Sequence, residues 1–401
     1  MTISKAENKS MEFQVFAKPF GSTCNLSCKY CYYLSKRDLY PDKSHFIMTY
    51  DIMEKYIIQH IEASTGDIIS FSWHGGEPLL AGIDFYRKVL KLQAVHKPDD
   101  KTILNGIQTN GTLIDEDWCR FIAGNGFFVG ISIDGPADFH DFFRRTRDDK
   151  GTFERVKRGY LLLKKFGIIP EILCVVNAEN VKYPLVIYDF FKKIGAKFIT
   201  FLPLVVPDVC SSSGVSKDSV PSREFGHFLS KVFDAWVEND IGEIKIQIFE
   251  EATRTAFNQD HTLCIFKVNC GSVPVIEHNG DFYSCDHYVS KDYLLGNLND
   301  HSLTWYLECE RQKQFGRAKS MKLPDYCRQC EVLAMCNGEC PKNRFILTPD
   351  GATGLNYLCE GYKIFFNHCR PFVEAITDAW KNQSGFLPHP PAPFPRSGRR
   401  G

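Results

Sequence analysis

The chain has 401 residues, which is room for two or three domains of ordinary size. Hydrophobic residues make up 44% and charged residues 24%, as in typical globular proteins, and 48 Lys and Arg balance 48 Asp and Glu. The balance argues against a binder of nucleic acid or anionic membrane, which needs a basic excess. We find no apolar run of about eighteen residues, the length of a membrane span, and no secretory signal. A cytoplasmic protein is therefore expected.

Cysteine is unusually frequent and unevenly placed. Nine of the sixteen cysteines lie between Cys264 and Cys359, and Cys24, Cys28 and Cys31 fall close together near the start. Intracellular chains rarely use disulfides, and cysteines that serve as small core residues would be scattered. The clustering therefore favours metal ligation.

The first half of the chain alternates between short β-rich runs and helical stretches. Strands are expected at 12–19, 67–73, 102–109, 127–134, 171–176 and 198–205. One helix is expected to begin at a capping box of Asp51 and Glu54, and others are expected at 85–95, 115–124, 153–166 and 184–194. This alternation predicts βα units with a parallel sheet. Six such units, over residues 12–210, would form a partial (β/α)6 barrel of the α/β class.

The pattern changes near residue 211. A Ser-rich connector precedes an expected helix at 225–237, and we assign 211–259 to this connecting region. Residues 260–375 have weak periodicity and dense cysteine, so bound ligands rather than a large core are expected to hold them together. The Pro-rich segment 379–401 is expected to be disordered.

The first cysteine motif follows the first expected strand. Cys24, Cys28 and Cys31 have the spacing C-x3-C-x2-C. Three thiolates are one short of a tetrahedral zinc site, and also one short of closing a four-iron cluster. The motif therefore indicates an open iron that binds another group. The alternative is a zinc site completed by a distant residue such as His45.

Polar or Gly-rich signatures follow three of the later strands. They are residues 74–78 (HGGEP), 108–112 (QTNGT) and 132–136 (SIDGP). In barrel-like α/β proteins the active site gathers at the C-terminal ends of the strands. We therefore expect an active site at that end of the sheet, beside the cysteine motif.

Together, these motifs resemble those of radical S-adenosylmethionine (SAM) enzymes. The resemblance covers roughly residues 12–210. It implies that the three cysteines hold a [4Fe–4S] cluster, whose open iron chelates the amino and carboxylate groups of SAM. It also implies that one-electron reduction of SAM yields a 5′-deoxyadenosyl radical. The cofactor carries that chemistry, while the barrel orients the substrate and excludes water.

The same resemblance implies which residues contact SAM. The Gly-Gly-Glu-Pro turn would bind the methionine amino group through its backbone and its carboxylate. Ser132 and Arg144 would lie at the ribose and carboxylate of SAM, and the segment after the last strand would lie near the adenine. The expected contacts are Tyr30, Gly76, Glu77, Ser132, Arg144 and Val205.

Eight further cysteines have spacings that suit ligation. Eight ligands are enough for two fully ligated four-iron clusters or for two four-cysteine zinc sites, and spacing alone does not separate these. The pattern resembles the SPASM extension of radical enzymes that modify peptides and proteins. By family topology, one auxiliary cluster would be held by Cys264, Cys270, Cys285 and Cys340, and the other by Cys327, Cys330, Cys336 and Cys359.

Residues 108–114 (QTNGTLI), the pair Cys285 and Asp286, and residues 356–359 (NYLC) resemble the anaerobic sulfatase-maturating enzymes more closely than other SPASM proteins. Departures from the family pattern are His74, where some members carry glutamine, and the run 201–205. The resemblance implies oxidation of a cysteine or serine in a sulfatase polypeptide to Cα-formylglycine, with an electron donor such as flavodoxin or ferredoxin. Asp286 is the candidate base, and a turn residue capping backbone amides is its alternative.

Two other functions stay open at this point. A SPASM peptide maturase that forms a thioether or other cross-link would share every cluster motif. A multi-zinc interaction module would carry no chemistry. The colour of the purified protein distinguishes the zinc module from both kinds of enzyme, because iron–sulfur clusters make a protein brown and zinc does not.

Overall fold

A ten-stranded sheet runs through the whole molecule. The computed structural model describes residues 13–40, 46–211 and 214–383. The strand order is β10-β9-β8-β1-β2-β3-β4-β5-β6-β7. The strands are β1 (Phe16–Ala17), β2 (Ile68–Trp73), β3 (Thr102–Thr109), β4 (Phe128–Ser132), β5 (Glu171–Val176), β6 (Phe198–Pro203), β7 (Lys245–Ile246), β8 (Val275–Ile276), β9 (Asp281–Tyr283) and β10 (Leu294–Asn297).

Strands β1 to β7 pair in parallel, which confirms the expected barrel-type α/β sheet. The sheet extends beyond the six expected strands at both edges. At one edge the connecting region supplies β7, and at the other β8 pairs in parallel with β1. Strands β9 and β10 continue antiparallel from β8. Only Phe16 and Ala17 of the first expected strand enter the sheet, and residue 12 lies outside the described residues.

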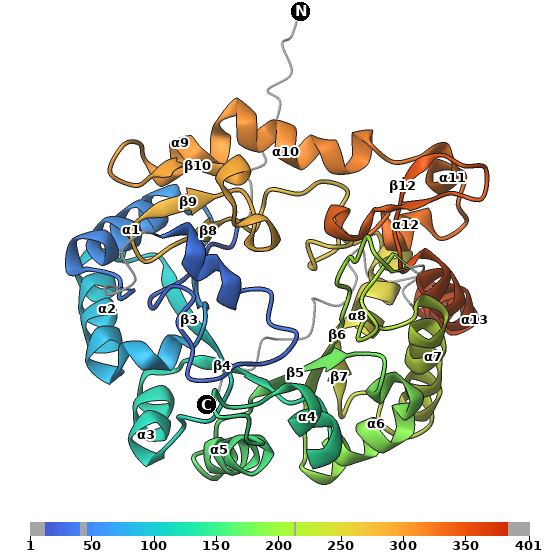
Figure 1. The fold of residues 1–401 in the computed structure, drawn as a ribbon, viewed down its shortest axis with the longest axis horizontal. Helices are drawn as coiled ribbons and strands as arrows, with labels where there is room; N and C mark the ends of the chain where they lie inside the picture. Colours follow the sequence, from blue (N-terminus) through green and yellow to red (C-terminus); the bar gives the residue numbers. More distant parts are fainter. Residues whose placement is uncertain (1–12, 41–45, 212–213, 384–401) are drawn as a thin grey trace, which may run out of the picture.

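Helices cover the outer side of the curved sheet, as Figure 1 shows. Of the described helices, none has the combination of length and apolarity needed to cross a lipid bilayer. The helices of the barrel and the connecting region are α1 (Tyr50–Ala63), α2 (Ile83–His96), α3 (Glu116–Asn125), α4 (Ala137–Phe143), α5 (Phe153–Lys165), α6 (Pro184–Lys193), α7 (Ser222–Asn239) and α8 (Gln247–Arg254).

The start of α1 differs from the expected capping box. Thr49 is the N-cap, and its hydroxyl accepts a hydrogen bond from the backbone N–H of Ile52. Asp51 lies inside the first turn instead, where its negative charge favours the positive end of the helix dipole. The sequence pattern therefore identified the helix, but not its cap.

The C-terminal region adds short elements and one long helix. The hairpin β11 (Ile346–Leu347) and β12 (Thr353–Leu355) stands apart from the main sheet. Residues 379–383 of the expected tail are helical, and residues 384–401 lie outside the described residues. The helices are α9 (Leu303–Glu308), α10 (Glu310–Met321), α11 (Asp325–Arg328), α12 (Leu333–Cys336) and α13 (Cys359–Gln383).

The C-terminal region shares its apolar core with the barrel. Phe266, Tyr306 and Phe366 are buried in the same continuous cluster as Trp73 in β2 and Phe201 in β6. We expected ligands rather than a large core to hold residues 260–375 together. The region instead packs against the barrel through aromatic side chains.

Helix α13 begins at a predicted cluster ligand and crosses α7 at two glycines. A Cβ on Gly226 would lie 2.4 Å from the carbonyl oxygen of Gly361, and a Cβ on Gly361 would lie 2.1 Å from that of Ser222. Only glycine allows the two backbones to approach so closely. This crossing sets the position of Cys359, two residues before Gly361.

We predict that Gly226→Ala destabilises the fold. The added methyl group forces the helices apart, and overpacking of this kind costs on the order of 1–3 kcal/mol. Gly124→Ala on α3 is the matched control, because a Cβ there meets nothing within 4 Å. It should stabilise the protein by about 1 kcal/mol through helix propensity. Urea unfolding measures both, and equal effects of the two substitutions would contradict the proposed crossing.

Candidate active site

The loop that carries the first cysteine motif is held by main-chain hydrogen bonds. The N–H of Ser27 donates to the carbonyl of Arg145 at 2.8 Å, and that of Lys29 donates to Phe143 at 2.9 Å. The segment after α4 thus supports the loop along its length. Because the contacts are backbone to backbone, they place Cys28 without depending on a particular side chain.

The Gly-Gly-Glu-Pro turn after β2 supports the loop from the other side. The N–H of Gly76 donates to Gly21 and that of Glu77 donates to Thr23, both at 2.9 Å. A Cβ on Gly76 would lie 2.0 Å from the carbonyl oxygen of Thr23. Glycine is therefore required at this position by the close approach of two backbones.

Glu77 links this turn to the end of β3. Its buried carboxylate accepts hydrogen bonds from the N–H of Leu79 at 3.0 Å, the hydroxyl of Thr109 at 2.8 Å and the N–H of Asn110 at 2.8 Å. Burial raises the pKa of Glu77 to about 7, although these donors favour the ionised form. Three of its acceptor positions are thus used inside the protein.

Cys24 lies inside this supported loop. Its Sγ accepts hydrogen bonds from the backbone N–H of Leu26 at 3.4 Å and from the Asn110 side chain at 3.6 Å. Burial raises the pKa of Cys24 to about 12, and the Glu77 carboxylate adds to this. A thiol of that kind ionises when a metal cation binds it. Hydrogen bonds to ligand sulfur also belong to the usual surroundings of iron–sulfur clusters.

Tyr30 and Arg144 meet at a carboxylate that the sequence analysis did not single out. Both donate to Oδ2 of Asp134, Tyr30 through its hydroxyl at 2.5 Å and Arg144 through Nε at 2.9 Å. The N–H of Val175 binds the other oxygen at 2.9 Å. Asp134 lies in the SIDGP signature, directly after a strand, and that placement was the available signal.

Ser132 lies at the end of β4, and the side chain of Gln108 donates to its hydroxyl at 3.2 Å. Gly130 makes room for this pair, since a Cβ there would lie 2.0 Å from Oε1 of Gln108. Val205 is buried just beyond β6. The expected SAM contacts thus gather at the C-terminal ends of the parallel strands.

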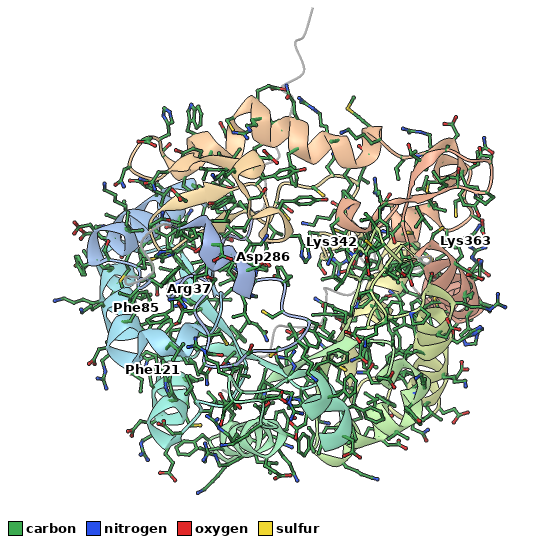
Figure 2. The ribbon with its side chains drawn as sticks, viewed as in Figure 1. Arg37, Phe85, Phe121, Asp286, Lys342 and Lys363 are labelled. Atoms are coloured by element: carbon green, nitrogen blue, oxygen red, sulfur yellow. The ribbon has the colours of Figure 1, made fainter. Side chains whose placement is uncertain are left out.

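Asp286 belongs to a buried ion pair. Its Oδ1 lies 2.6 Å from Nζ of Lys18, and the Tyr32 hydroxyl donates to Oδ2. Burial alone would raise the pKa of Asp286, but the Lys18 cation outweighs it and holds that pKa well below its usual range. Figure 2 shows Asp286 on the inner side of the ring of elements. Lys18 was missed, although a lysine at the end of an apolar strand was a usable signal.

Two histidines accompany this ion pair. His74 stacks on Phe16 with ring centroids 4.0 Å apart, and His287 lies 5.5 Å from the ring of Tyr32. Burial lowers the pKa of each to about 3, helped by Lys18 for His74 and by Lys342 for His287. Both are therefore neutral near pH 7, and Asp286 is the ionised base of the group.

The eight C-terminal cysteines fall into two groups of four, and within each group the thiols raise one another's pKa. Burial and then the Cys270 thiol raise the pKa of Cys264 to about 11, and Cys264 and Cys270 also act on Cys285. Cys285 in turn acts on Cys340. These four are the set expected for one auxiliary cluster.

The thiols of the second group of four cysteines also raise one another's pKa. Burial raises the pKa of Cys359 to about 12, and the thiols of Cys327 and Cys330 add to it. Burial followed by Glu339 raises the pKa of Cys336 to about 12, with Cys359 and Cys327 contributing. Within each expected ligand set, the thiols are thus close enough to raise one another's pKa.

Within the described ranges, no group of three His, Cys, Asp or Glu side chains is placed to hold a single metal ion. A lysine lies beside the first of these two groups of thiols. The buried Lys319 donates to the carbonyls of Cys264 at 3.0 Å and Ile265 at 2.7 Å. A buried cation needs an opposite charge, which an anionic cluster supplies.

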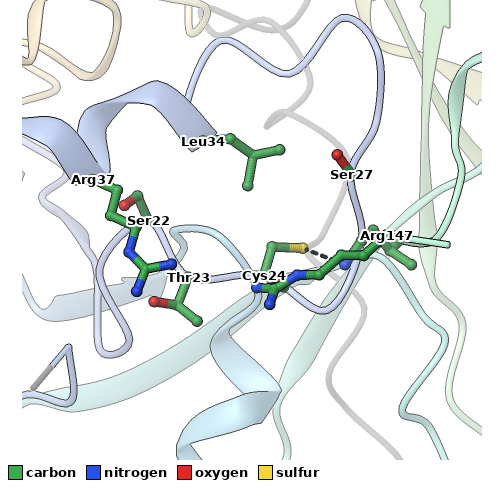
Figure 3. A pocket seen from close by; sticks show the side chains of 8 residues that line it. Ser22, Thr23, Cys24, Ser27, Leu34, Arg37 and Arg147 are labelled. Carbon is green, nitrogen blue, oxygen red and sulfur yellow. Dashed lines mark hydrogen bonds between the residues drawn. The ribbon is translucent and has the colours of Figure 1, made fainter. Parts of the chain in front are cut away.

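A cavity of about 250 Å³ lies beside the first cysteine motif (Figure 3). Arg147 reaches it and donates from Nη2 to the carbonyl of Cys24 at 2.6 Å. Arg37 approaches from the opposite side. The described lining residues include no acidic side chain; they are Ser22, Thr23, Cys24, Leu26, Ser27, Leu34, Arg37 and Arg147.

Comparison with known proteins agrees with this geometry. Residues 19–190 match the family model of the radical SAM superfamily, and residues 268–331 match that of the SPASM iron–sulfur cluster-binding domain. The first match covers the cysteine loop, the Gly-Gly-Glu-Pro turn and Asp134. The second includes Asp286 and four of the eight C-terminal cysteines.

Full-length relatives are also similar. A serine-type anaerobic sulfatase-maturating enzyme of Bacteroides thetaiotaomicron is 41% identical over 382 residues, with 92% of each chain covered. A cysteine-type anaerobic sulfatase-maturating enzyme of Clostridium perfringens is 34% identical over 356 residues, covering 88% of this chain and 95% of the relative.

Solved structures give the same result. Native anSMEcpe with bound AdoMet and Cp18Cys peptide superposes with a TM-score of 0.82 at 32% identity, covering 92% of this chain and 99% of that one. SuiB of Streptococcus suis bound to S-adenosylmethionine has a TM-score of 0.58 at 14% identity over 83% of this chain and 72% of that one, a similarity of fold alone. The chain is therefore a radical SAM enzyme of the anaerobic sulfatase-maturating family.

Proposed function

We propose that this enzyme oxidises a cysteine or serine side chain in a sulfatase polypeptide to Cα-formylglycine. The observation that carries the proposal is Asp286, held ionised by Lys18 beside the first cysteine loop. SAM and the iron–sulfur clusters, when bound, supply the radical that removes a hydrogen atom and the acceptor for one electron. The chain itself supplies the pocket, the orientation and the base.

The residues that surround SAM have complementary groups. Arg144 uses Nε for Asp134, and its two terminal nitrogens have no partner among the described residues, so they suit a carboxylate. Tyr30 packs under that guanidinium, whose central carbon lies 5.4 Å from the ring centroid. The further contacts are Gly76, Glu77, Ser132 and Val205. Glu77 acts by holding the turn, since three donors already occupy its carboxylate.

Three [4Fe–4S] clusters complete the proposed set of cofactors. The first is held by Cys24, Cys28 and Cys31. The two groups of four C-terminal cysteines would hold the auxiliary clusters, because the thiols within each group act on one another and a cation lies near each group.

Asp286 would take the proton that leaves the substrate. Conversion of a CH2–OH or CH2–SH group to its carbonyl or thiocarbonyl removes one hydrogen atom, one electron and one proton. From cysteine, water then replaces the sulfur of the thiocarbonyl with oxygen and releases hydrogen sulfide. Loss of the electron leaves a protonated carbonyl or thiocarbonyl, which is a strong acid. A carboxylate of low pKa is therefore basic enough, and Lys18 keeps it ionised before the transfer.

We expect anaerobically reconstituted enzyme to convert sulfatase-type peptides to the aldehyde. Paired peptides that differ only in the target residue, Cys-x-Pro-x-Arg and Ser-x-Pro-x-Arg, separate the two substrate types by mass spectrometry. The proposal is supported if the serine peptide loses two hydrogens, or if the cysteine peptide loses two hydrogens and exchanges its sulfur for oxygen. Deoxyadenosine formation with neither peptide changed, or a cross-linked product, contradicts it.

We predict that Asp286→Asn separates two steps of the reaction. The amide keeps the shape of the side chain but is not basic, so aldehyde formation should fall by roughly 10²–10⁴-fold. Deoxyadenosine should still form with peptide present and should still take up deuterium from a β-deuterated substrate. Asp292→Asn, in the same region, is the control and should leave both products unchanged. Loss of both products together in Asp286→Asn would instead indicate a structural role.

An acidic electron carrier, of the flavodoxin or ferredoxin type, is the proposed donor. The two segments that frame the cavity beside Cys24, residues 22–39 and 145–150, carry six Lys or Arg against three Asp, in a chain of zero net charge. Such a local excess attracts acidic partners over long range. All sixteen cysteines are free, which fits the reducing cytoplasm that such carriers share.

We predict that Arg37→Glu and Arg147→Glu together slow reduction by a purified acidic flavodoxin by at least roughly ten-fold, as reversal of a steering charge does. SAM cleavage driven by reduced methyl viologen, a small cation, should not slow. Added salt should slow flavodoxin-driven cleavage in the wild type only. The control is Lys88→Glu with Lys91→Glu on α2, far along the chain from the cysteine loop. An equal loss with both reductants would contradict the docking role.

A further inference from the structure

The chain passes from one auxiliary ligand set to the other through an unusual turn. Cys336 belongs to the second set and Cys340 to the first. Between them, Asn337, Gly338 and Glu339 all have left-handed backbone angles, with φ of 46°, 68° and 49°. Residues other than glycine rarely adopt this conformation, so neighbouring groups must hold the turn in place.

The side chain of Arg344 binds the backbone of this turn. Arg344 donates from Nε to the carbonyl of Gly338 at 2.8 Å, and from Nη2 to those of Asn337 at 3.0 Å and Glu339 at 3.1 Å. Its Nη1 donates to the carbonyl of Lys319 in α10 at 2.5 Å. A planar guanidinium can bind several carbonyls at once, whereas a lysine ammonium lacks that fixed fork.

Arg344 brings a positive charge as well as hydrogen bonds. In the described part of the chain it forms no ion pair with a carboxylate and donates hydrogen bonds to four carbonyl groups, while the buried Glu339 carboxylate acts on it electrostatically. Burial lowers the pKa of Arg344, while the thiols of Cys270, Cys327 and Cys336 act in the opposite direction. Those thiols come from both ligand sets, so the guanidinium lies within electrostatic reach of each.

Lys319 provides a natural comparison. It is buried and donates to the carbonyls of Cys264 and Ile265. The thiols that act on it are Cys270, Cys264 and Cys340, all from the first set. Arg344 thus acts on thiols of both sets, whereas Lys319 acts on thiols of the first set and Lys363 on thiols of the second.

We propose that Arg344 is a positioning residue that fixes the turn between the auxiliary clusters and raises the reduction potential of both, while Lys319 raises that of the first. The inference rests on the proposed ligand sets. A cluster bound by four thiolates becomes more negative by one charge on reduction, so a fixed cation stabilises the reduced form. When bound, an auxiliary cluster would supply the acceptor for the one electron that the substrate loses. A higher potential favours that transfer.

Arg344→Gln tests the charge, because glutamine keeps hydrogen-bond donors and loses the cation. The readout is a redox titration of the full-length reconstituted protein, followed by EPR. The equilibrium constant for reduction of each auxiliary cluster should fall by about ten-fold, which lowers its potential by ~59 mV for a one-electron couple. Lys319→Met should lower that of the first cluster only. Each signal is identified by its absence after Cys270→Ala or Cys327→Ala.

Arg328→Gln is the matched control. Arg328 in α11 also donates to backbone carbonyls, those of Ser320 at 3.3 Å and Met321 at 3.1 Å, but it is 48% exposed. Its substitution should leave both potentials unchanged. Arg344→Lys keeps the charge and should stay near the wild-type potentials, even if Arg344→Gln loses iron.

Two results would overturn the proposal. One is a pair of unchanged potentials in Arg344→Gln with full iron content. The other is a shift in Arg344→Lys as large as ten-fold, because that variant retains the cation. A wild-type protein that binds only one cluster would instead refute the proposed ligand sets, and iron content distinguishes that case.

Discussion

Compensation of buried charge is the constraint on which the inner side of this molecule depends. An ion removed from water is stable only beside an opposite charge or enough hydrogen-bond donors and acceptors. Asp134 meets Arg144, and Asp286 meets Lys18. Glu77 has hydrogen-bond donors from two strand ends. Lys319 and Arg344 donate hydrogen bonds to carbonyls, and cysteine thiols and the buried Glu339 carboxylate act on both cations electrostatically. Anionic clusters, if bound by those thiols, would add further negative charge.

The pairing of β1 with β8 connects the two halves of the active site. Strand β1 leads to Lys18 and then to the first cysteine loop, while β8 and β9 lead to Asp286. Because β1 lies between β2 and β8, the barrel and the SPASM region share one continuous hydrogen-bonded sheet. The distance between Asp286 and the first cysteine loop is thereby set by strand register rather than by a flexible linker.

Much of the barrel could be predicted from local sequence. Strands 102–109 and 171–176 have the expected bounds, since apolar alternation and flanking turns agree there. The cap of α1 could not be predicted in this way, because Thr49 and Asp51 are both good capping residues. The path by which the chain enters the helix decided between them. The helix after the connector was expected, but strand β7 was not. Two residues carry too little periodicity to identify a strand.

The candidate site, too, could be predicted from the sequence only in part. Cysteine spacing and the signatures after the strands indicated the ligands and the SAM contacts, because loop motifs carry their chemistry in short stretches of sequence. Asp134 stood inside one of those signatures without an assigned role. Nothing in the local sequence connects Lys18 with Asp286, which is 268 positions away.

The sequence by itself determined the number, type and order of the cysteine ligands, the βα alternation and the candidate base, since each is written in residues close together in the chain. Only the tertiary structure decided which buried charges face one another. It paired Lys18 with Asp286, joined Tyr30 to Arg144 through Asp134 and placed Arg344 between two ligand sets. Such partnerships depend on long-range register and on desolvation, and neither is a property of any short segment.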